Sequence, residues 1–477
     1  MRTRWAFLLL SATAILTSKG TIKAADSIAA PTFTKDVLPI LQKHCQSCHR
    51  PGQIGPFSML SYESTRPWAR SIKTKVASRQ MPPWFADPRH GAFANDRSLG
   101  QQDVDTLAKW ADAGAPQGDL HDAPPAIAWP ADGWQIKPDI VVRGPAFRVP
   151  AHPPKNVVEW ADITIPSGFT RDTLITSMEI KPSDLSVTHH ICVSFTPHRP
   201  NVKYYAWSWS ESPRDADGVA TDKGATSGRA GSVPLPVVSA AGRTAELDGN
   251  AVRLSRVASG GGNLCYVPGV QADDYRPYRA AKLIPANSDI TFAVHYTPTG
   301  QEVVDYPLLG FTLAERQPEK RWISFNISGA GPTFAIPPND ANYQSPPAEA
   351  EFGADAWIVQ MMPHMHLRGK DMTYRLIFPD GREQVILSVP RYDFNWQLVY
   401  QPIAPIYVPK GTRLRIDAHF DNSSANKFNP NPGITVYPGR MTWEEMMSPF
   451  FGVLVDSTTD PTTVLKLKGR TVDGTGA

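Results

Sequence analysis

The feature that most constrains the fold begins at about residue 136. From there to the C-terminus, short runs rich in Val, Ile, Thr and Phe recur, each bounded by Pro, Gly, Asn or Asp. Such runs are typical of β-strands, and many of them in succession indicate a sandwich. The 46 prolines among 477 residues agree with this, because proline is excluded from helix interiors and central strands. We expect strands at residues 139–142, 162–165, 289–296, 373–378, 384–389 and 413–420.

The domain organisation follows from where this pattern starts and how long it runs. The β region is too long for one ordinary sandwich, so we expect two all-β sandwich (jelly-roll-like) domains, residues 136–318 and 319–477. Residues 30–119 form a separate unit, which places apolar residues at helical intervals at both of its ends. Residues 120–135 are expected to be a linker, and the Gly-, Ser-, Ala- and Asp-rich residues 211–262 a long excursion.

The N-terminal residues 1–24 have the pattern of a secretory signal peptide. Two arginines precede an apolar run that is too short to span a bilayer, and small residues follow it. Cleavage near Ala24 removes four basic residues and no acid, so the net charge changes from 48 − 45 = +3 to 44 − 45 = −1. No basic field then remains to indicate nucleic-acid binding. We expect a periplasmic or secreted protein without a transmembrane segment in the mature chain; an uncleaved N-terminal anchor is the alternative.

Two cysteines and a histidine in the first unit form a recognisable haem motif, Cys45-Gln-Ser-Cys48-His49. Thiols at this spacing can add to the two vinyl groups of one haem, and the adjacent histidine then reaches the iron. A chance match and a redox pair of cysteines are the alternatives, but a redox pair has no need of His49. The unit therefore resembles a small class I-like cytochrome c domain with one covalent haem c.

A haem of this kind needs a second axial ligand, and Met81 is the best candidate. It follows His49 by 32 residues and precedes the last helix of the unit, which is the order found in small cytochromes c. A thioether ligand raises the reduction potential of the haem iron and favours electron transfer over reaction with oxygen. Met59, which we expect in the core, and His90 and His44 are weaker rivals.

The β region contains further histidines in metal-binding arrangements. His364 and His366 are two residues apart, so in a strand they project from one face and can share a metal. His189 and His190 are adjacent, so a regular strand would place them on opposite faces. Both can bind one ion only if the strand is twisted or bulged there.

His295 is the third element of this pattern. In a strand, His295 lies on the opposite face from Ile290, Phe292 and Val294. If those three residues pack inward, His295 faces a different surface. Any one of these histidines alone is more often a satisfied surface or core residue than a ligand. The set taken together is more specific.

The order and context of these histidines resemble the copper type II, ascorbate-dependent monooxygenases, which include the peptidylglycine α-hydroxylating and dopamine β-monooxygenases. The resemblance covers about residues 135–465. In that family a His-His pair and a later histidine in a V-H-Y-type strand hold one copper, and an H-x-H with a methionine in an acidic motif holds the second. It implies one copper on His189, His190 and His295, and another on His364, His366 and Met446.

The sequence also departs from the family. Its animal members carry several disulfides, whereas only Cys192 and Cys265 could form one here, with two buried thiols as the alternative. Met447 is a rival to Met446, and His419 is an additional histidine that either faces the second copper or lines a strand. Imidazoles with one thioether suit copper, whereas zinc more usually recruits carboxylate or thiolate.

The resemblance implies a copper-dependent monooxygenase that hydroxylates an organic substrate with O2, with His364, His366 and Met446 as the catalytic ligands. Electrons would come from ascorbate or a redox protein and pass through the c-type haem. Two other interpretations remain open. One is a non-catalytic electron-transfer or copper-binding scaffold, and the other a haem dehydrogenase with structural zinc or calcium.

Overall fold

The computed structural model describes residues 30–467 apart from residues 131, 153–156, 199–201, 206, 212–231, 235–263, 268, 270–271, 328, 330–332 and 440–441. The expected signal peptide and most of the expected excursion at residues 211–262 lie outside the described residues. Within the described part of the chain, no helix is long and apolar enough to cross a membrane.

The first unit is helical at both ends, as the sequence predicts. Phe33 near its start and Trp110 near its end pack together, with 6.1 Å between their ring centroids. Gly114 follows the last helix with a φ of 86°, which only glycine adopts without strain. The helices are η1 (Phe33–Val37), α1 (Leu38–His44), α2 (Tyr62–Thr65), η2 (Arg66–Trp68), α3 (Ala69–Ala77) and α4 (Gln101–Asp112).

The rest of the described chain is β-sheet in two halves, preceded by the short turn η3 (Leu120–Asp122). The first half contains β1 (Ile140–Arg143), β2 (Phe147–Val149), β3 (Val157–Pro166), β4 (Thr173–Pro182), β5 (Thr188–Pro197), β6 (Ser208–Glu211), β7 (Ser232–Pro234), β8 (Leu264–Tyr266), β9 (Asp273–Asp274), η4 (Arg276–Tyr278), β10 (Ala280–Ile284), β11 (Ser288–Tyr296), β12 (Val303–Asp305) and β13 (Pro307–Leu313). The second half contains β14 (Lys320–Asn326), β15 (Tyr343–Gln344), β16 (Ala348–Phe352), β17 (Ala356–Met362), β18 (Gly369–Ile377), β19 (Glu383–Val389), β20 (Ile406–Val408), β21 (Arg413–Phe420), β22 (Phe450–Asp456), η5 (Pro461–Thr463) and β23 (Leu465–Leu467).

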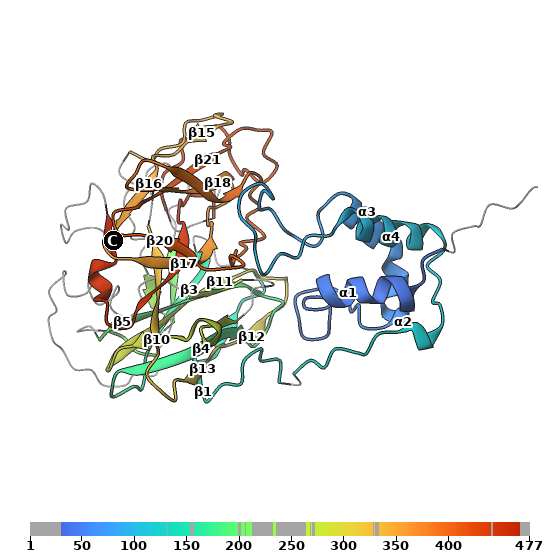
Figure 1. Ribbon diagram of the computed structural model, residues 1–477, viewed down its shortest axis with the longest axis horizontal. Coiled ribbons are helices and arrows are strands. Elements are labelled where there is room, and N and C mark those ends of the chain that lie inside the picture. Colours follow the sequence, from blue (N-terminus) through green and yellow to red (C-terminus); the bar gives the residue numbers. More distant parts are fainter. Residues whose placement is uncertain are drawn as a thin grey trace, which may run out of the picture.

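The two halves share one sheet. It runs in the order β1-β13-β4-β10-β14-β22-β17-β20, with β9 beside β4, and crosses between the halves where β10 pairs with β14 in parallel over two residues. In the first half a second sheet, β7-β6-β3-β11-β5-β8, packs over the core on one side. In the second half the sheet β19-β18-β21-β16-β23 packs over another core. Figure 1 shows the two halves stacked beside the helices.

Strands β14, β17 and β22 are covered on both faces, which explains their sequences. Trp322, Val359 and Leu454 belong to the core of the first half, while their neighbours Ile323, Ile358 and Val453 belong to that of the second. Strands buried on both sides read as continuous apolar runs and lack the alternation of a half-exposed strand. The central layer is therefore common to both cores.

Residues 84–97, which we call the clamp segment, leave the helical unit and pack on the second half. Phe93 lies in the second core, and its ring meets that of Tyr400 with 5.6 Å between centroids. The backbone N–H of Asp87 donates to Ser388, and that of Ala94 to Gln401. Figure 1 shows this blue segment reaching from the helices toward the orange strands. The sequence predicts one unit over residues 30–119, and the contacts of the clamp segment extend beyond that unit.

Cys192 on β5 and Cys265 on β8 form a disulfide, as expected, and they face each other directly in the ladder between these strands. We predict that replacing both with serine lowers the free energy of unfolding by about 4 kcal/mol, because the bond closes a loop of 73 residues. Urea denaturation of the wild type, the double variant and the reduced wild type measures this. Equal midpoints for oxidised and reduced wild type would contradict it.

Candidate functional site

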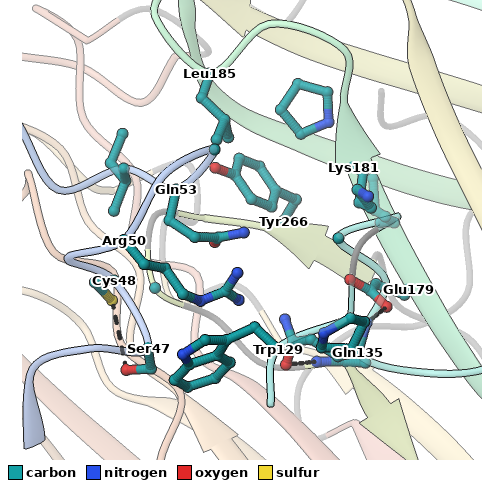
Figure 2. A pocket seen from close by; sticks show the side chains of 18 of the residues that line it. Ser47, Cys48, Arg50, Gln53, Trp129, Gln135, Glu179, Lys181, Leu185 and Tyr266 are labelled. Atoms are coloured by element: carbon teal, nitrogen blue, oxygen red, sulfur yellow. Dashed lines mark hydrogen bonds between the residues drawn. The ribbon is translucent and has the colours of Figure 1, made fainter. Parts of the chain in front are cut away.

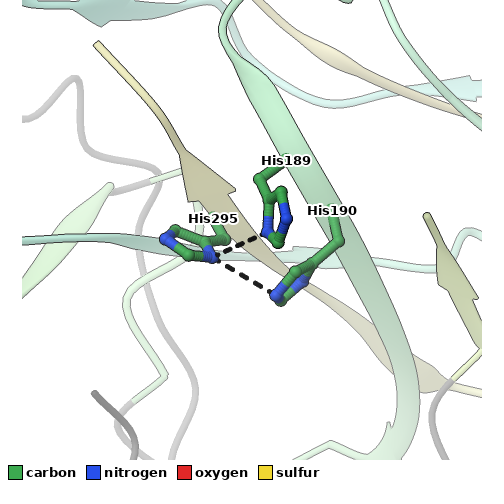
Figure 3. Close-up of side chains that lie close together, drawn as sticks. All are labelled: His189, His190 and His295. Carbon is green, nitrogen blue, oxygen red and sulfur yellow. Dashed lines mark hydrogen bonds between the residues drawn. The ribbon is translucent and has the colours of Figure 1, made fainter. Parts of the chain in front are cut away.

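Three imidazoles from two neighbouring strands converge at one end of β5 and β11 (Figure 3). Nδ1 of His295 lies 3.3 Å from Nδ1 of His189 and 3.3 Å from Nε2 of His190. One ligand nitrogen from each of the three rings lies within 4.8 Å of the other two, as ligands of one ion do. Nitrogens 3.3 Å apart are close enough to bind one ion at metal–nitrogen bonds of about 2.0–2.1 Å.

A β-bulge brings the adjacent pair of histidines together. His295 pairs with His190, but the next residue, Tyr296, pairs with Thr188, so His189 is the extra residue of β5. In a regular strand His189 would share the core-facing side of Ile191. The bulge instead turns His189 toward the side of His190. A bulge or twist at this position is what the sequence analysis requires if both histidines are to bind one metal. Val294 is buried in the first core, so His295 faces the opposite side of the sheet, as expected.

His190 and His295 are buried and His189 is half-buried, in a setting that includes an indole ring. The ring of Trp160 stacks on His295 with 5.2 Å between centroids and meets His190 edge-on at 4.7 Å. Burial and the neighbouring imidazoles of His295 and His364 lower the pKa of His189 to about 3. The same causes lower the pKa of His190 well below its usual value. Both rings are neutral at pH 7, the form that binds a metal.

His364 and His366 form a second group just after β17. Their ring centroids lie 5.3 Å apart. Nδ1 of His364 lies 2.7 Å from Oε1 of Gln397, and Nδ1 of His366 lies 3.2 Å from the backbone oxygen of Glu444. Each oxygen accepts a hydrogen bond from Nδ1–H, so in the neutral form of each ring Nε2 is the unprotonated nitrogen. Partners of this kind orient the histidines of metal sites.

The backbone around this second group is held by a buried carboxylate. Glu445 accepts the N–H of His366 at 2.9 Å, that of Arg368 at 2.6 Å and that of Met446 at 3.2 Å. Burial raises the pKa of Glu445 to about 7, against these three hydrogen bonds, which lower it. Arg368 is fully buried and also donates to Asn422.

The two candidate methionines have different surroundings. Met447 is fully buried in the second core, where its sulfur lies 3.5 Å from Oγ of Ser345. Met446 is half-buried, and its backbone is tied to Glu445. The thioether of Met447 is therefore committed to the core. His419 donates from Nδ1 to Asp371 at 2.7 Å, so this additional histidine has a carboxylate partner of its own.

One aromatic ring contacts both histidine groups. The ring of Phe394 lies 5.3 Å from that of His189 and 6.0 Å from that of His366, measured between centroids. The carbonyl oxygen of Phe394 also accepts from Nε2 of Gln397 at 3.4 Å. The two histidine groups are thus neighbours across a phenyl ring.

In the helical unit, Cys45, Cys48 and His49 lie in the turn that follows α1. Both cysteines are free thiols, and burial raises the pKa of Cys45 to about 12. Nδ1 of His49 lies 3.3 Å from the carbonyl oxygen of Phe57, to which it donates, so Nε2 keeps its lone pair. A Cβ at Gly55 would lie 2.8 Å from that same Nδ1, so only glycine fits against this turn.

The rival haem ligands are placed as follows. Met59 is buried in the core of the helical unit, as expected. His44 is buried and its Nδ1 contacts the carbonyl oxygen of Arg97 at 3.2 Å. Met81 and His90 are half-buried in the segment between α3 and α4.

A cavity of about 1440 Å³ separates the turn of the two cysteines from the first β half. Cys48 and Lys181 lie on opposite sides of it in Figure 2. The guanidinium of Arg50 stacks over Trp129 at 4.2 Å, and Tyr266 projects from the strand that carries Cys265. The disulfide, the thiol of Cys48 and the cavity are thus close together.

Several residues that build the second group had no local signal in the sequence. Gln397 lies 33 residues from His364 and Arg368 lies 77 residues from Glu445, so no spacing rule relates them. The sequence pointed to Glu445 only indirectly, because it belongs to the acidic motif that favoured Met446 as a metal ligand.

We predict that the metal-free protein loses stability as the pH falls from about 6.5 toward 4. Burial lowers the pKa of His364 to about 4, from 6.5. Between these two pKa values the imidazole of His364 is protonated in the unfolded chain and neutral in the native chain. The free energy of unfolding therefore decreases as the pH falls below 6.5. Between pH 7 and 4.5 urea denaturation should show wild type losing about 2–3 kcal/mol more than His364→Gln. Parallel curves would contradict the prediction.

Comparisons with known proteins add no identification. No model of a known protein family matches the chain, and no curated protein matches it. Among solved structures, a chain in "Structure of infectious bursal disease virus Gt strain" aligns over 69% of this chain and 75% of its own length, at 11% identity and a TM-score of 0.16. A TM-score this low carries no argument about fold or function.

Proposed function

We propose that this chain is an exported oxidoreductase that carries one covalent c-type haem and two copper ions and hydroxylates an organic substrate with O2. The observation that carries the proposal is the convergence of His189, His190 and His295 beside a second pair of imidazoles. Imidazoles, together with the thioether of Met446, are a ligand set that suits copper in both oxidation states.

The first group fits an ion on its own geometry. His295 has one Nδ1 that faces two other ring nitrogens at 3.3 Å, and a single proton there satisfies only one of them. A cation with three nitrogen ligands satisfies all three. In the family that the sequence resembles, copper at this position stores and passes an electron.

The second group is prepared for a ligand in a different way. Gln397 and the backbone of Glu444 hold the protons of His364 and His366 on Nδ1, so Nε2 is the unprotonated nitrogen of each ring. Met446 is the candidate third ligand, since Met447 belongs to the core. Copper held here would supply the reaction with O2.

The turn of Cys45, Cys48 and His49 fits a covalent haem. Both thiols are free in a chain whose other two cysteines are joined, and Nε2 of His49 is uncommitted. Met81 is the proposed second ligand. Haem bound here would accept electrons from ascorbate or a redox protein one at a time.

The chain's own residues define what the site does with a substrate. Trp160 packs its ring against His295 and Phe394 packs its ring against His189, so apolar surface lies beside the first histidine group. Glu445 keeps the backbone of His366 and Met446 in one arrangement, so the ligands need little rearrangement.

A copper-binding scaffold without catalysis is the second candidate, and burial favours it. His190 and His295 are only 2% and 3% exposed, as in sites whose metal has a structural role. The two candidates differ in the number of ions and in their reaction with O2.

We predict two coppers per haem in the purified, copper-loaded protein, measured by elemental analysis with the haem spectrum. His295→Ala should remove one ion and His366→Ala the other, because each takes a ligand from one group only. His419→Ala is the matched control, a histidine of the second half with its own carboxylate partner. Unchanged copper in both ligand variants would contradict the two sites.

We further predict that the haem of the anaerobically reduced protein is reoxidised by O2 through the second group. His364→Ala should slow this reoxidation, followed by absorbance in a stopped-flow instrument, while His419→Ala should not. Equal rates for wild type and His364→Ala would mean that the copper sites are not the oxidase and would favour the scaffold.

A further inference from the structure

We propose that Asn95 and Gln397 are positioning residues for His364, through which the helical unit sets the metal affinity of the second histidine group. The inference rests on the proposed function only in that His364 and His366 bind a metal. It assigns a role to the clamp segment, residues 84–97, which the resemblance does not cover.

The first link is the hydrogen bond between Gln397 and His364. Gln397 is 3% exposed, and its Oε1 lies 2.7 Å from Nδ1 of His364. Its Nε2 donates to the carbonyl oxygen of Phe394 at 3.4 Å, which fixes the orientation of the amide. The oxygen therefore accepts from His364, and the proton stays on Nδ1.

The second link is the chain around Gln397, which has no regular secondary structure between β19 and β20. Its position depends on contacts with other segments. Tyr400 exchanges two backbone hydrogen bonds with Met361, at 2.8 and 2.9 Å, three residues before His364. This contact holds one side of the segment 397–401.

The third link is the clamp, which holds the other side. Nδ2 of Asn95 donates to the carbonyl oxygen of Val399 at 2.8 Å, and its Oδ1 accepts from the N–H of Gln401 at 3.0 Å. The side chain thus pairs with the backbone as a neighbouring strand would. Ala94 donates to Gln401 at 2.7 Å, and Ile403 to Ala92 at 2.9 Å.

Aromatic packing reinforces the clamp. The rings of Trp84 and Tyr400 meet edge to face with 4.9 Å between centroids, and Phe93 joins them. Trp84 follows Met81 by three residues. One loop of the helical unit therefore carries the candidate haem ligand and also fixes the segment that orients His364.

The test measures copper affinity at the second group alone, by competition with a chelator in the full-length His295→Ala protein. Gln397→Ala should weaken binding by about 10–100-fold, the effect of losing such a partner. Asn95→Ala should weaken it by about 3–10-fold, as expected for a lost hydrogen bond. The double variant should be no weaker than Gln397→Ala, because both act through one contact. Gln397→Glu keeps the acceptor and should retain the affinity.

Two controls separate positioning from a general loss of structure. In His366→Ala protein, where only the first group remains, Asn95→Ala should leave copper affinity unchanged. Arg89→Ala lies in the same clamp, but its side chain is 81% exposed and pairs with Asp87, so it should change neither group. If Asn95→Ala does not fold, Asn95→Asp removes the donor to Val399 and keeps the acceptor.

The proposal is overturned if Asn95→Ala weakens both groups equally, if it leaves the second group unchanged, or if the double variant is additive. Each of these results leaves the proposed function intact. Absence of copper at His364 and His366 in the otherwise wild-type chain would overturn the proposed function as well.

Discussion

The carboxylate of Glu445 accepts three backbone N–H groups, from His366, Arg368 and Met446, in a place that water does not reach. The turn between β17 and β18 forms few hydrogen bonds of its own, so this side chain replaces a strand partner. Without it the buried N–H groups of His366 and Arg368 would lose their acceptor, each at a cost of about 1–3 kcal/mol. The geometry of the second histidine group therefore depends on a residue about eighty positions further along the chain.

The sheet common to both halves fixes the relation between the two histidine groups. Strand β17 lies in that sheet and leads directly into the turn of His364, and its two faces contribute to different cores. A small apolar cluster, with Val267 and Met362 at its centre and Phe450 beside it, fills the space next to the disulfide. A close-packed junction of this kind resists separation, so the groups are held at a constant spacing.

The sequence predicted features that depend on neighbours in the chain. The strands with alternating residues and the helices at both ends of the first unit are examples. The pairing of Cys192 with Cys265 was expected for another reason, because these are the two cysteines outside the C-x-x-C-H motif. The requirement for a bulge at His189 was also visible, because adjacent residues cannot share one face of a regular strand. Other features could not be predicted from the sequence. Strands β17 and β22 lack alternation because both of their faces are buried. The contacts of Gln397 and of the clamp segment join residues that are far apart in the sequence.

The two pairs of cysteines differ in oxidation state. Cys192 and Cys265 face each other across a ladder and are joined, whereas Cys45 and Cys48 are free thiols, the state that the proposed haem attachment would require. Burial of Cys45 raises its pKa to about 12, which keeps it in the unreactive thiol form once the helical unit has folded. Under the proposed function, haem attachment would therefore be faster while α1 is still unfolded, because the thiol of Cys45 would then ionise more readily.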